Sequence, residues 1–403
     1  MSDATIAPRS GPARAAPKRR MQLSWSDPAF RNIVWQVIIV GCVAAIVWYL
    51  VGNTNRNLAA RHIATGFGFL STTAGIPIGE HLIPYDPALN TYGYALLVGV
   101  LNTLKVAFVG IILATILGTL IGIARLSKNF LLARLAATYV EVLRDIPVLL
   151  QLLFWYTLLQ TLPPPRQAFN PITGFFISNR GLKVPLFEWE PVHWWVLAAF
   201  LAGLLGVIAW SGRAKRQQEA TGKRPPVWPV ALGLLIVFPA VVAVALGAPF
   251  VLDLPSLRGF NFQGGGAISP EYVALTVGLT IYTAAYIAEI VRSGIQAVPQ
   301  GQWEAAGALG LRPGTVLRQI VLPQATRVII PPMTSQFLNL TKNSSLAVAI
   351  GYQDLVSVAE TTLNQTGQAI EGIAITMAVY LSISLSISFF MNWYNARIAL
   401  VER

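Results

Sequence analysis

The chain has 403 residues, of which 54% are hydrophobic and 11% are charged, and its mean hydropathy is +0.58. A soluble domain carries roughly 25% charged residues, so this composition excludes an ordinary soluble protein and predicts a polytopic membrane protein. The net charge of +12 comes from short Lys and Arg runs between apolar segments, a pattern that is typical of membrane orientation signals and not of nucleic acid binding.

The first 24 residues form a polar segment, rich in Ala, Pro and Arg, that precedes any apolar run. A signal peptide places its apolar region much nearer the start, so we predict a disordered basic arm at residues 1–24 instead. After this arm, eight segments approach the roughly 20 apolar residues that a membrane helix needs. The expected spans are Ile33–Val51, Tyr94–Ala124, Phe130–Leu162, Trp194–Trp210, Pro229–Leu252, Glu271–Val291, Val328–Tyr352 and Ile370–Trp393.

Prolines and polar residues mark breaks within two of these spans. Pro147 is expected to kink the third span or to start a helix inside it. Pro331, Pro332 and the polar run 339–345 are expected to interrupt the seventh span. The longer connections outside the membrane are predicted to be loops, at residues 52–92, 163–191 and 253–269.

The basic residues predict the orientation of the chain in the membrane. Clusters of Lys and Arg precede the first span and follow the second, fourth, sixth and eighth spans. The clearest cluster holds five basic residues between Arg213 and Arg224. Because eight spans put every cluster on the cytoplasmic side, we predict an all-α polytopic membrane protein of about eight transmembrane helices, with both termini inside.

A polar segment punctuated by turn residues, Gly301–Pro323, lies between two of the apolar segments. Its first part has apolar positions at helical spacing from Trp303 to Leu309. Gly310 can take the left-handed conformation that ends a helix. Glu304 is expected near the start of this short helix, where a negative charge interacts favourably with the helix dipole.

The second part of the same segment predicts another short helix. Pro313 suits a first helical turn because its φ angle is fixed. One apolar stripe then follows at Val316, Leu317, Ile320 and Val321. The segment is therefore expected to be a short helix, a glycine-stopped turn and a second short helix.

This segment also resembles a known motif. The spacing of Glu304-Ala305-Ala306, Gly310, Ile320 and Leu322-Pro323 resembles the cytoplasmic loop of ABC-importer permeases, which docks on an ATP-hydrolysing partner. A departure from the family is Arg312-Pro313-Gly314, where a Ser or a similar helix cap is usual. Other segments resemble the same family, namely Asn102-Thr103-Leu104, YVEVLRDIP at 139–147, AYIAEIVR at 285–292 with Gly294, Gln324-Ala325, and Lys342-Asn343-Ser344-Ser345-Leu346.

Together these motifs resemble ABC-transporter inner-membrane permeases of the polar amino acid (histidine/glutamate/glutamine/arginine/opine) family. The resemblance covers about residues 94–160 and 270–395 and is strongest to the permeases of general L-amino acid transporters. The resemblance implies a core of five helices with an extra first helix and an inserted helical hairpin. The implied divisions are 25–93 for the extra helix and its periplasmic loop, 94–162 for the first part of the core, 163–269 for a periplasmic loop and the hairpin, and 270–403 for the remaining core, with the coupling loop at 296–328.

The resemblance further implies a subunit of an ATP-driven importer of L-amino acids in the bacterial inner membrane. The residues that couple to the ATPase would be Glu304, Ala305, Ala306, Gly310, Ile320, Leu322 and Pro323. The expected partners are an ATP-binding subunit dimer, a second and homologous permease, a periplasmic amino-acid-binding protein and the lipid bilayer. The chain has no GxxxxGK[ST] motif, so ATP and Mg²⁺ are expected in the partner ATPase and no cofactor in this chain.

An amino acid zwitterion needs polar partners inside a dry bundle of helices. The candidates for lining the substrate path are Gln336, Asn339, Lys342, Ser344, Ser345 and Glu289. For the 339–345 cluster, an equally good interpretation is a helix break whose polar groups satisfy each other. Glu289 is expected to pair with Arg292, three residues on, and Lys105 either faces the bundle interior or snorkels.

Two other classes of protein remain as alternatives. An ion-gradient-driven secondary amino acid transporter would suit the interrupted seventh span, but it would leave Gly301–Pro323 without a role. An enzyme is not expected, because the chain has no HExxH or GxSxG motif. Its single cysteine, Cys42, and its scattered histidines predict no disulfide and no metal site.

Overall fold

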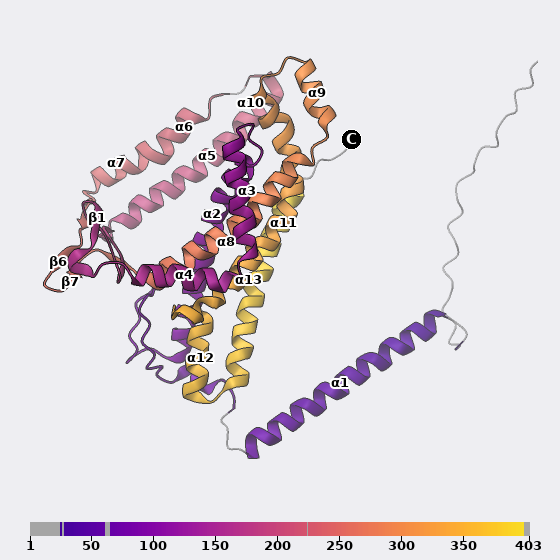
Figure 1. The fold of residues 1–403 in the computed structure, drawn as a ribbon, viewed down its shortest axis with the longest axis vertical. Coiled ribbons are helices and arrows are strands. Elements are labelled where there is room, and N and C mark those ends of the chain that lie inside the picture. Colours follow the sequence, from indigo (N-terminus) through magenta and orange to yellow (C-terminus); the bar gives the residue numbers. More distant parts are fainter. Residues whose placement is uncertain (1–24, 26–27, 61–64, 224, 399–403) are drawn as a thin grey trace, which may run out of the picture. The chain divides into compact units, whose positions relative to one another are not determined.

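The computed structural model describes residues 25, 28–60, 65–223 and 225–398, so the predicted basic arm lies outside the described residues. The structure divides into two units (Figure 1). One unit consists of residues 1–66 and 366–368, and the other of residues 67–365 and 369–403. The first unit contains α1 (Pro28–Ala60), a single apolar helix of 33 residues that includes the predicted span Ile33–Val51.

The second unit contains the other helices. They are η1 (Phe67–Ser71), α2 (Tyr92–Ala124), α3 (Phe130–Asp145), α4 (Val148–Gln160), η2 (Pro165–Gln167), α5 (His193–Thr221), α6 (Trp228–Leu232), η3 (Gly233–Val237), α7 (Phe238–Ala245), α8 (Pro270–Gln296), α9 (Gln300–Ala308), α10 (Pro313–Val316), η4 (Leu317–Val321), α11 (Leu322–Asn343), η5 (Ser344–Ile350), α12 (Leu355–Thr366) and α13 (Ala369–Ile398). The helical class that the composition predicts is therefore confirmed.

Eight short strands were not predicted, and they lie in the two segments expected to be loops after α4 and before α8. They are β1 (Phe169–Ile172), β2 (Phe175–Ser178), β3 (Gly181–Val184), β4 (Leu186–Phe187), β5 (Leu252–Asp253), β6 (Ser256–Arg258), β7 (Asn261–Gln263) and β8 (Gly266–Ile268). The largest sheet has the antiparallel order β1-β2-β3-β8, and β4 pairs with β5 and β6 with β7. Runs of two to four residues are too short for an alternating pattern to predict strands.

Helices α2 and α8 lie side by side and run in the same direction. Gly118 and Gly122, the GxxxG pair of α2, make this approach possible. A Cβ atom added to Gly118 would lie 2.7 Å from the Ile287 side chain and 2.8 Å from the Ala284 carbonyl oxygen. One added to Gly122 would lie 2.7 Å from the Ala288 carbonyl oxygen. The two backbones are thus closer than any larger residue would allow.

Helices α3 and α4 form a bent pair. Their axes differ by 104° at the break, and Pro147 is the N-cap of α4. The prediction that Pro147 starts a helix is confirmed. Pro147 cannot donate a backbone hydrogen bond, which costs nothing at a helix start.

Helix α11 differs from its prediction. Pro331 and Pro332 lie inside it and do not interrupt it. The helix also follows directly on α10 and the π-helical turn η4, so the segment from Pro313 to Asn343 is one helical run. Contacts of α11 with α8 and α13 hold this run together although each proline removes one backbone donor. The expected break at the polar run is present, because α11 changes into the 3-10 helix η5 at Ser344.

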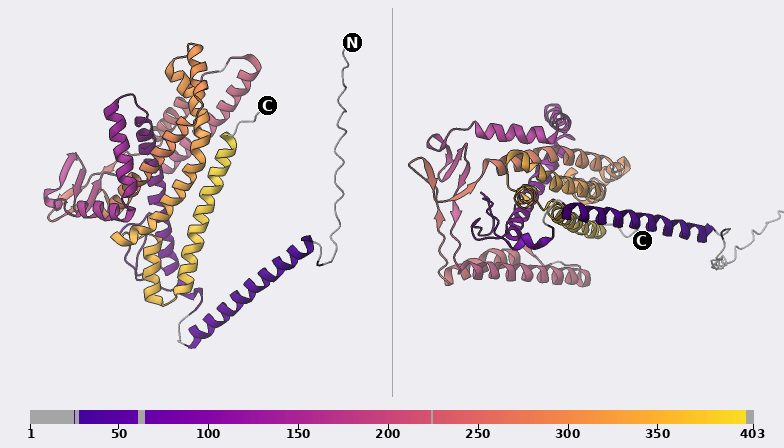
Figure 2. Two further views of the ribbon diagram at one scale, coloured as in Figure 1. Left: turned by 45° about the vertical axis from the view of Figure 1, so that its right-hand side comes forward. Right: turned by 90° about the horizontal axis from the view of Figure 1, so that it is seen from below.

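The helices of the inserted hairpin also have different bounds from those predicted. Helix α5 continues to Thr221 and takes in the first basic residues of the predicted loop, whereas α7 ends at Ala245 and Leu252 belongs to β5. Figure 2 shows α5 lying beside α6 and α7. Gly247 has a positive φ of 64° just after α7, which suits the end of a helix.

Six helices within the described residues are long and apolar enough to cross a membrane, and the bent pair α3–α4 makes a seventh if it counts as one span. Helix α11 has 22 residues but is not one of these helices, because it is more polar than they are. The expected count of eight spans therefore stays a prediction.

The second unit has two ends with different character (Figure 1). We call the end that carries α9 and α10 the loop end, and the end that carries α12 and the extended residues 73–80 the strap end. The C-terminal ends of α2, α5 and α8 lie at the loop end (Figure 1), and basic residues occur at each, just after α2 and within the last turns of α5 and α8, in agreement with the orientation that the sequence predicts. At the strap end, Ala74, Ile76 and Ile78 alternate inward and pack against α2 and α12.

The close contact of α2 with α8 leads to a first prediction. Gly118→Val is expected to lower the free energy of unfolding by about 1–3 kcal/mol, because the new side chain overlaps Ile287 and overpacked cores cost this much. Thermal unfolding of the purified protein in detergent measures it. Gly212→Val is the control, since a Cβ there meets nothing within 4 Å and it also lies in a long helix. Equal losses in the two variants would contradict the close contact.

Candidate functional site

The segment Gly301–Pro323 forms a rigid turn at the loop end. Helix α9 is closed by Gly310, whose φ of 68° is left-handed as predicted. The Gly310 amide donates to the Gly307 carbonyl at 2.9 Å and the Leu311 amide donates to the Ala306 carbonyl at 3.2 Å. These two bonds form a Schellman motif, which satisfies the carbonyl groups at the end of the helix. Pro313 then opens α10, again as predicted.

The predicted coupling residues divide into an exposed set and a supporting set. Glu304, Ala305, Gly310, Leu322 and Pro323 are exposed. Ala306 and Ile320 face inward, and Ala306 belongs to the main hydrophobic core together with Val316 and Val321. The core therefore fixes the position of the exposed residues.

Two details of this segment differ from the predictions. Glu304 lies beyond the first turn of α9, which begins at Gln300, so the expected interaction with the helix dipole is wrong. Leu317 is exposed and does not join the buried stripe. The π-helical turn at Leu317–Val321 changes the helical spacing there, and a pattern based on 3.6 residues per turn cannot predict such a change.

A cluster of charges joins the ends of α2 and α8 at the loop end. Glu289 pairs with Arg292 at 2.5 Å, as predicted, and also with Arg125, the C-cap residue of α2. Arg292 donates a further bond to Gln296 at 2.6 Å. Each carboxylate oxygen of Glu289 thus has a guanidinium partner, and the cluster holds the ends of α2 and α8 together next to Gly122.

Glu289 and Gln336, two of the predicted path residues, line the same pocket. This pocket has a volume of about 300 Å³ and lies between α3, α8 and α11. Arg144 also lines it, with its guanidinium 5.0 Å from the ring centre of Tyr286, a cation–π contact. A carboxylate, a guanidinium, an amide and a phenol ring therefore surround one small space between α3, α8 and α11.

The other predicted path residues lie elsewhere on α11 and η5. Asn339 and Lys342 are exposed on α11. Ser344 donates its hydroxyl to the Thr341 carbonyl and Ser345 to the Lys342 carbonyl, both at 2.7 Å. These two hydroxyls bond the last turn of α11, as expected for a helix break that satisfies its own polar groups.

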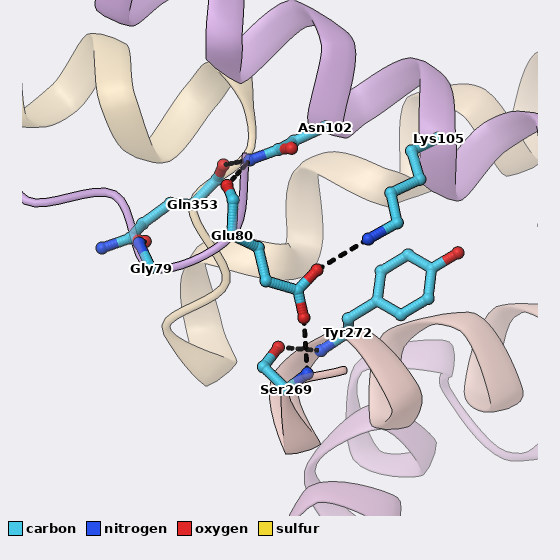
Figure 3. A network of polar contacts seen from close by, with 7 residues as sticks. All are labelled: Gly79, Glu80, Asn102, Lys105, Ser269, Tyr272 and Gln353. Atoms are coloured by element: carbon cyan, nitrogen blue, oxygen red, sulfur yellow. Dashed lines mark hydrogen bonds and ion pairs between the residues drawn. The ribbon is translucent and has the colours of Figure 1, made fainter. Parts of the chain in front are cut away.

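A polar network at the strap end was not predicted (Figure 3). The Glu80 carboxylate pairs with Lys105 of α2 at 2.8 Å and accepts a bond from the Ser269 amide, the N-cap of α8, at 2.5 Å. The Lys105 ammonium also lies 4.0 Å from the ring centre of Tyr272. Lys105 thus packs inside the second unit, between Glu80 and Tyr272. The signal in the sequence is a lysine inside an apolar span, which needs an acidic partner, but the sequence does not identify Glu80 as that partner.

The same network ties residues 73–80 to the segment between η5 and α12. Gln353 accepts a bond from the Gly79 amide at 2.6 Å and donates one to the Pro77 carbonyl at 2.7 Å. Asn102 donates both of its amide hydrogens, to the carbonyls of Glu80 and Gln353, at 2.8 and 2.9 Å. The extended segment is therefore fixed on both sides.

Asp354 is a fully buried carboxyl group at the start of α12, outside the membrane-spanning helices. It accepts a bond from the Ser357 amide at 3.0 Å and one from the Tyr380 hydroxyl at 3.4 Å. Burial raises the pKa of Asp354 to about 7, because the charged form is poorly solvated. Within the described part of the chain, no group of three His, Cys, Asp or Glu side chains could hold a metal ion.

Comparisons with known proteins show which proteins this chain is similar to. The family described as binding-protein-dependent transport system inner membrane component matches residues 225–400. The putative amino-acid ABC transporter permease YhdX of Escherichia coli K12 is 50% identical over 94% of this chain and 97% of its own length. The general L-amino acid transport system permease AapQ of Rhizobium johnstonii is 49% identical over 94% of both chains. The glutamate/glutamine/aspartate/asparagine transport system permease BztB of Rhodobacter capsulatus is 44% identical over 95% of this chain and 97% of its own.

The charge cluster at the loop end gives a second prediction. Glu289→Gln is expected to lower the free energy of unfolding by about 1–3 kcal/mol, because a neutral amide replaces the acceptor shared by Arg125 and Arg292. Thermal unfolding in detergent is the measurement. Glu141→Gln is the matched control, since Glu141 is exposed on α3. If the two variants unfold at the same temperature, the cluster does not stabilise the fold.

Asp354 gives a third prediction, on pH. In the unfolded chain the Asp354 carboxyl has a pKa of about 4, against about 7 in the folded protein. Between about pH 4 and 7 the folded state therefore binds more protons than the unfolded state. The contribution of Asp354 to stability is complete below this window and is lost as the pH rises through about 7. The unfolding temperature of Asp354→Asn is therefore expected to fall less between pH 5 and 8 than that of the wild type.

The exposed Glu188 supplies the control for this pH series. Glu188→Gln should keep the pH dependence of the wild type. An unchanged slope in Asp354→Asn would show that Asp354 is not protonated in the folded state at neutral pH.

Proposed function

This chain belongs to the family of binding-protein-dependent transport system inner membrane components, and we propose that it is the permease subunit of an ATP-driven importer for L-amino acids. Members of the family are multi-pass inner membrane proteins that act in transport and not as enzymes. The names of YhdX, AapQ and BztB support amino acids as the substrate class.

The exposed surface of Gly301–Pro323, the middle part of the segment 296–328, carries the proposal, and from here on the name coupling loop means Gly301–Pro323 alone. Its Schellman motif and its buried Ala306 hold Glu304 and Ala305 in fixed positions at the basic end of the protein. Small side chains allow a partner surface to approach closely, and Glu304 offers an acceptor to the donors of that partner. An ATPase dimer is the partner that a chain without its own phosphate-binding loop requires.

The mechanism follows from the continuous helix after the coupling loop. The ATPase dimer binds ATP and Mg²⁺, and its closure displaces α9 and α10. Because Pro313–Asn343 is one helical run packed against α8 and α13, the displacement reaches η5 at the strap end as a rigid-body movement. The permease then alternates between inward-facing and outward-facing states.

A second, homologous permease subunit completes the translocation path, and a periplasmic binding protein delivers the amino acid at the strap end. The contribution of this chain to the path is the pocket of Glu289 and Gln336, together with the face of α11 that exposes Asn339 and Lys342. Ser344 and Ser345 fix the end of this face through their bonds to backbone carbonyls.

A fourth prediction tests the coupling loop. The complete transporter, with its ATPase, second permease and binding protein, is reconstituted in proteoliposomes, and uptake of radiolabelled L-glutamine is measured with and without ATP inside. We expect ATP-dependent uptake in the wild type. Glu304→Lys and Gly310→Asp should each reduce this uptake at least tenfold and should co-purify with less ATPase. The first variant reverses the charge of the docking surface, and the second strains the left-handed turn.

Glu219→Lys is the matched control, because it makes the same charge reversal at an exposed position of α5. It should transport as the wild type does. Normal uptake by the two coupling-loop variants would rule out this loop as the docking surface. Uptake that follows an ion gradient without ATP would favour the alternative, a secondary transporter.

A further inference from the structure

The strap end contains a second polar pocket, separate from the pocket of Glu289 and Gln336. Its volume is about 350 Å³, which lies within the usual range for small-molecule sites. Five stretches of chain that are far apart in the sequence form its walls, so the pocket is a product of the tertiary fold. They contribute Gly79 and Glu80 from the extended segment, Asn102 from α2, Arg180 from the turn between β2 and β3, Ala267, Ser269 and Glu271 from β8 and the start of α8, and Gly351, Tyr352 and Gln353 from the segment before α12.

Two buried side chains of this pocket have polar atoms without a partner. Asn102 is 1% exposed and Tyr352 is 3% exposed. The Asn102 Oδ1 atom and the Tyr352 hydroxyl make no hydrogen bond within the described residues. The orientation of the Asn102 amide is fixed, because both of its hydrogens are donated to backbone carbonyls. A buried polar atom without a partner costs about 1–3 kcal/mol, so both atoms point to a ligand that satisfies them.

The charges around the pocket are also incompletely paired. The Glu80 carboxylate is neutralised by Lys105 and bonded by the Ser269 amide. The Arg180 guanidinium, in contrast, forms no ion pair or hydrogen bond with the part of the chain that the structure describes. Glu271 accepts one bond, from the Tyr156 hydroxyl at 3.2 Å, and has no cationic partner there. One cation and one anion thus remain free to bind a ligand.

We propose that this pocket, the strap-end pocket, captures a free amino acid by its α-ammonium and α-carboxylate groups. Glu271 and Asn102 Oδ1 accept hydrogen bonds from the ammonium group, and Arg180 and the Tyr352 hydroxyl donate to the carboxylate group. A lone anion would leave Glu271 and Asn102 Oδ1 unsatisfied, and a lone cation would leave Arg180 unpaired. Only a zwitterion uses all four groups.

This assignment rests on the proposed function and adds two properties to it. The pocket binds groups that every amino acid shares, so it discriminates weakly between side chains. It also lies at the end opposite the coupling loop, so it takes the substrate before the pocket of Glu289 and Gln336 does. The segment that carries Gly79 and Glu80 forms one wall, so the polar network of Figure 3 holds the pocket in its binding shape.

The test is equilibrium binding of radiolabelled L-glutamine to the membrane complex of both permeases and the ATPase in nanodiscs, with the binding protein left out. Arg180→Gln and Glu271→Gln are each expected to weaken binding about tenfold or more, because each removes a charge-assisted hydrogen bond. Tyr352→Phe removes only the hydroxyl and should weaken binding less. Arg258→Gln is the control, since Arg258 is exposed on β6 and does not line the pocket.

Competing ligands separate the two α-groups. Unlabelled L-alanine and L-leucine should compete with similar affinities, whereas 4-carbamoylbutanoate, which lacks the α-ammonium group, should compete at least tenfold more weakly. Arg180 is exposed, so a loss of folding does not explain a loss of binding in its variant.

Failure of this inference is distinguishable from failure of the proposed function. A wild type that shows ATP-dependent uptake but no saturable binding, or binding that Arg180→Gln and Glu271→Gln leave unchanged, overturns the strap-end pocket alone. A wild type without ATP-dependent uptake overturns the proposed function.

Discussion

The close parallel contact between α2 and α8 is the constraint on which the rest of the second unit depends. Gly118 and Gly122 remove the side chains that would separate the two helices, and polar groups then close both ends of the contact. At the loop end Arg125 reaches Glu289, and at the strap end Lys105 reaches Tyr272 and Glu80. Since lipid supplies no hydrophobic drive between helices, close packing and buried ion pairs are what hold such a contact together. Each of the two pockets lies next to one of these polar closures.

Helix α11 connects the same two ends along a different route. At 1.5 Å per residue the run from Pro313 to Asn343 extends about 45 Å, more than the roughly 30 Å of a bilayer core. Its first turns belong to the coupling loop, and η5, which follows it, leads directly to Tyr352 and Gln353 of the strap-end pocket. In the proposed importer, a movement caused by the ATPase therefore travels along one helical run to η5 and from there to the wall of the pocket that holds the incoming substrate.

The sequence predicted the features that depend on local chemistry. Composition and apolar length predicted the helical membrane class, Gly310 its left-handed turn, Pro147 the start of α4, and residue spacing the two short helices of Gly301–Pro323. It could not predict features that depend on segments far apart in the chain. Glu80 and Lys105 are 25 residues apart and meet only because the extended segment packs on α2. The expected break at the prolines of α11 was wrong, because tertiary packing outweighs the free-energy cost of a proline inside a helix. The expected apolar stripe was wrong at Leu317, because the π-helical turn at Leu317–Val321 changes the number of residues per turn, which sequence patterns take as constant.

The pairing of β3 with β8 determines where this chain could be shortened. Val184 is the register partner of Gly266, so the chain leaves the sheet before the α5–α7 hairpin and returns to it at neighbouring positions. Residues 185–265 therefore form an excursion whose two ends are already joined by backbone hydrogen bonds. A two-residue hairpin linker could replace the entire excursion without altering the start of α8. The architecture is modular at this point, and a shorter permease can be obtained by excision with almost no loop-closure entropy to overcome.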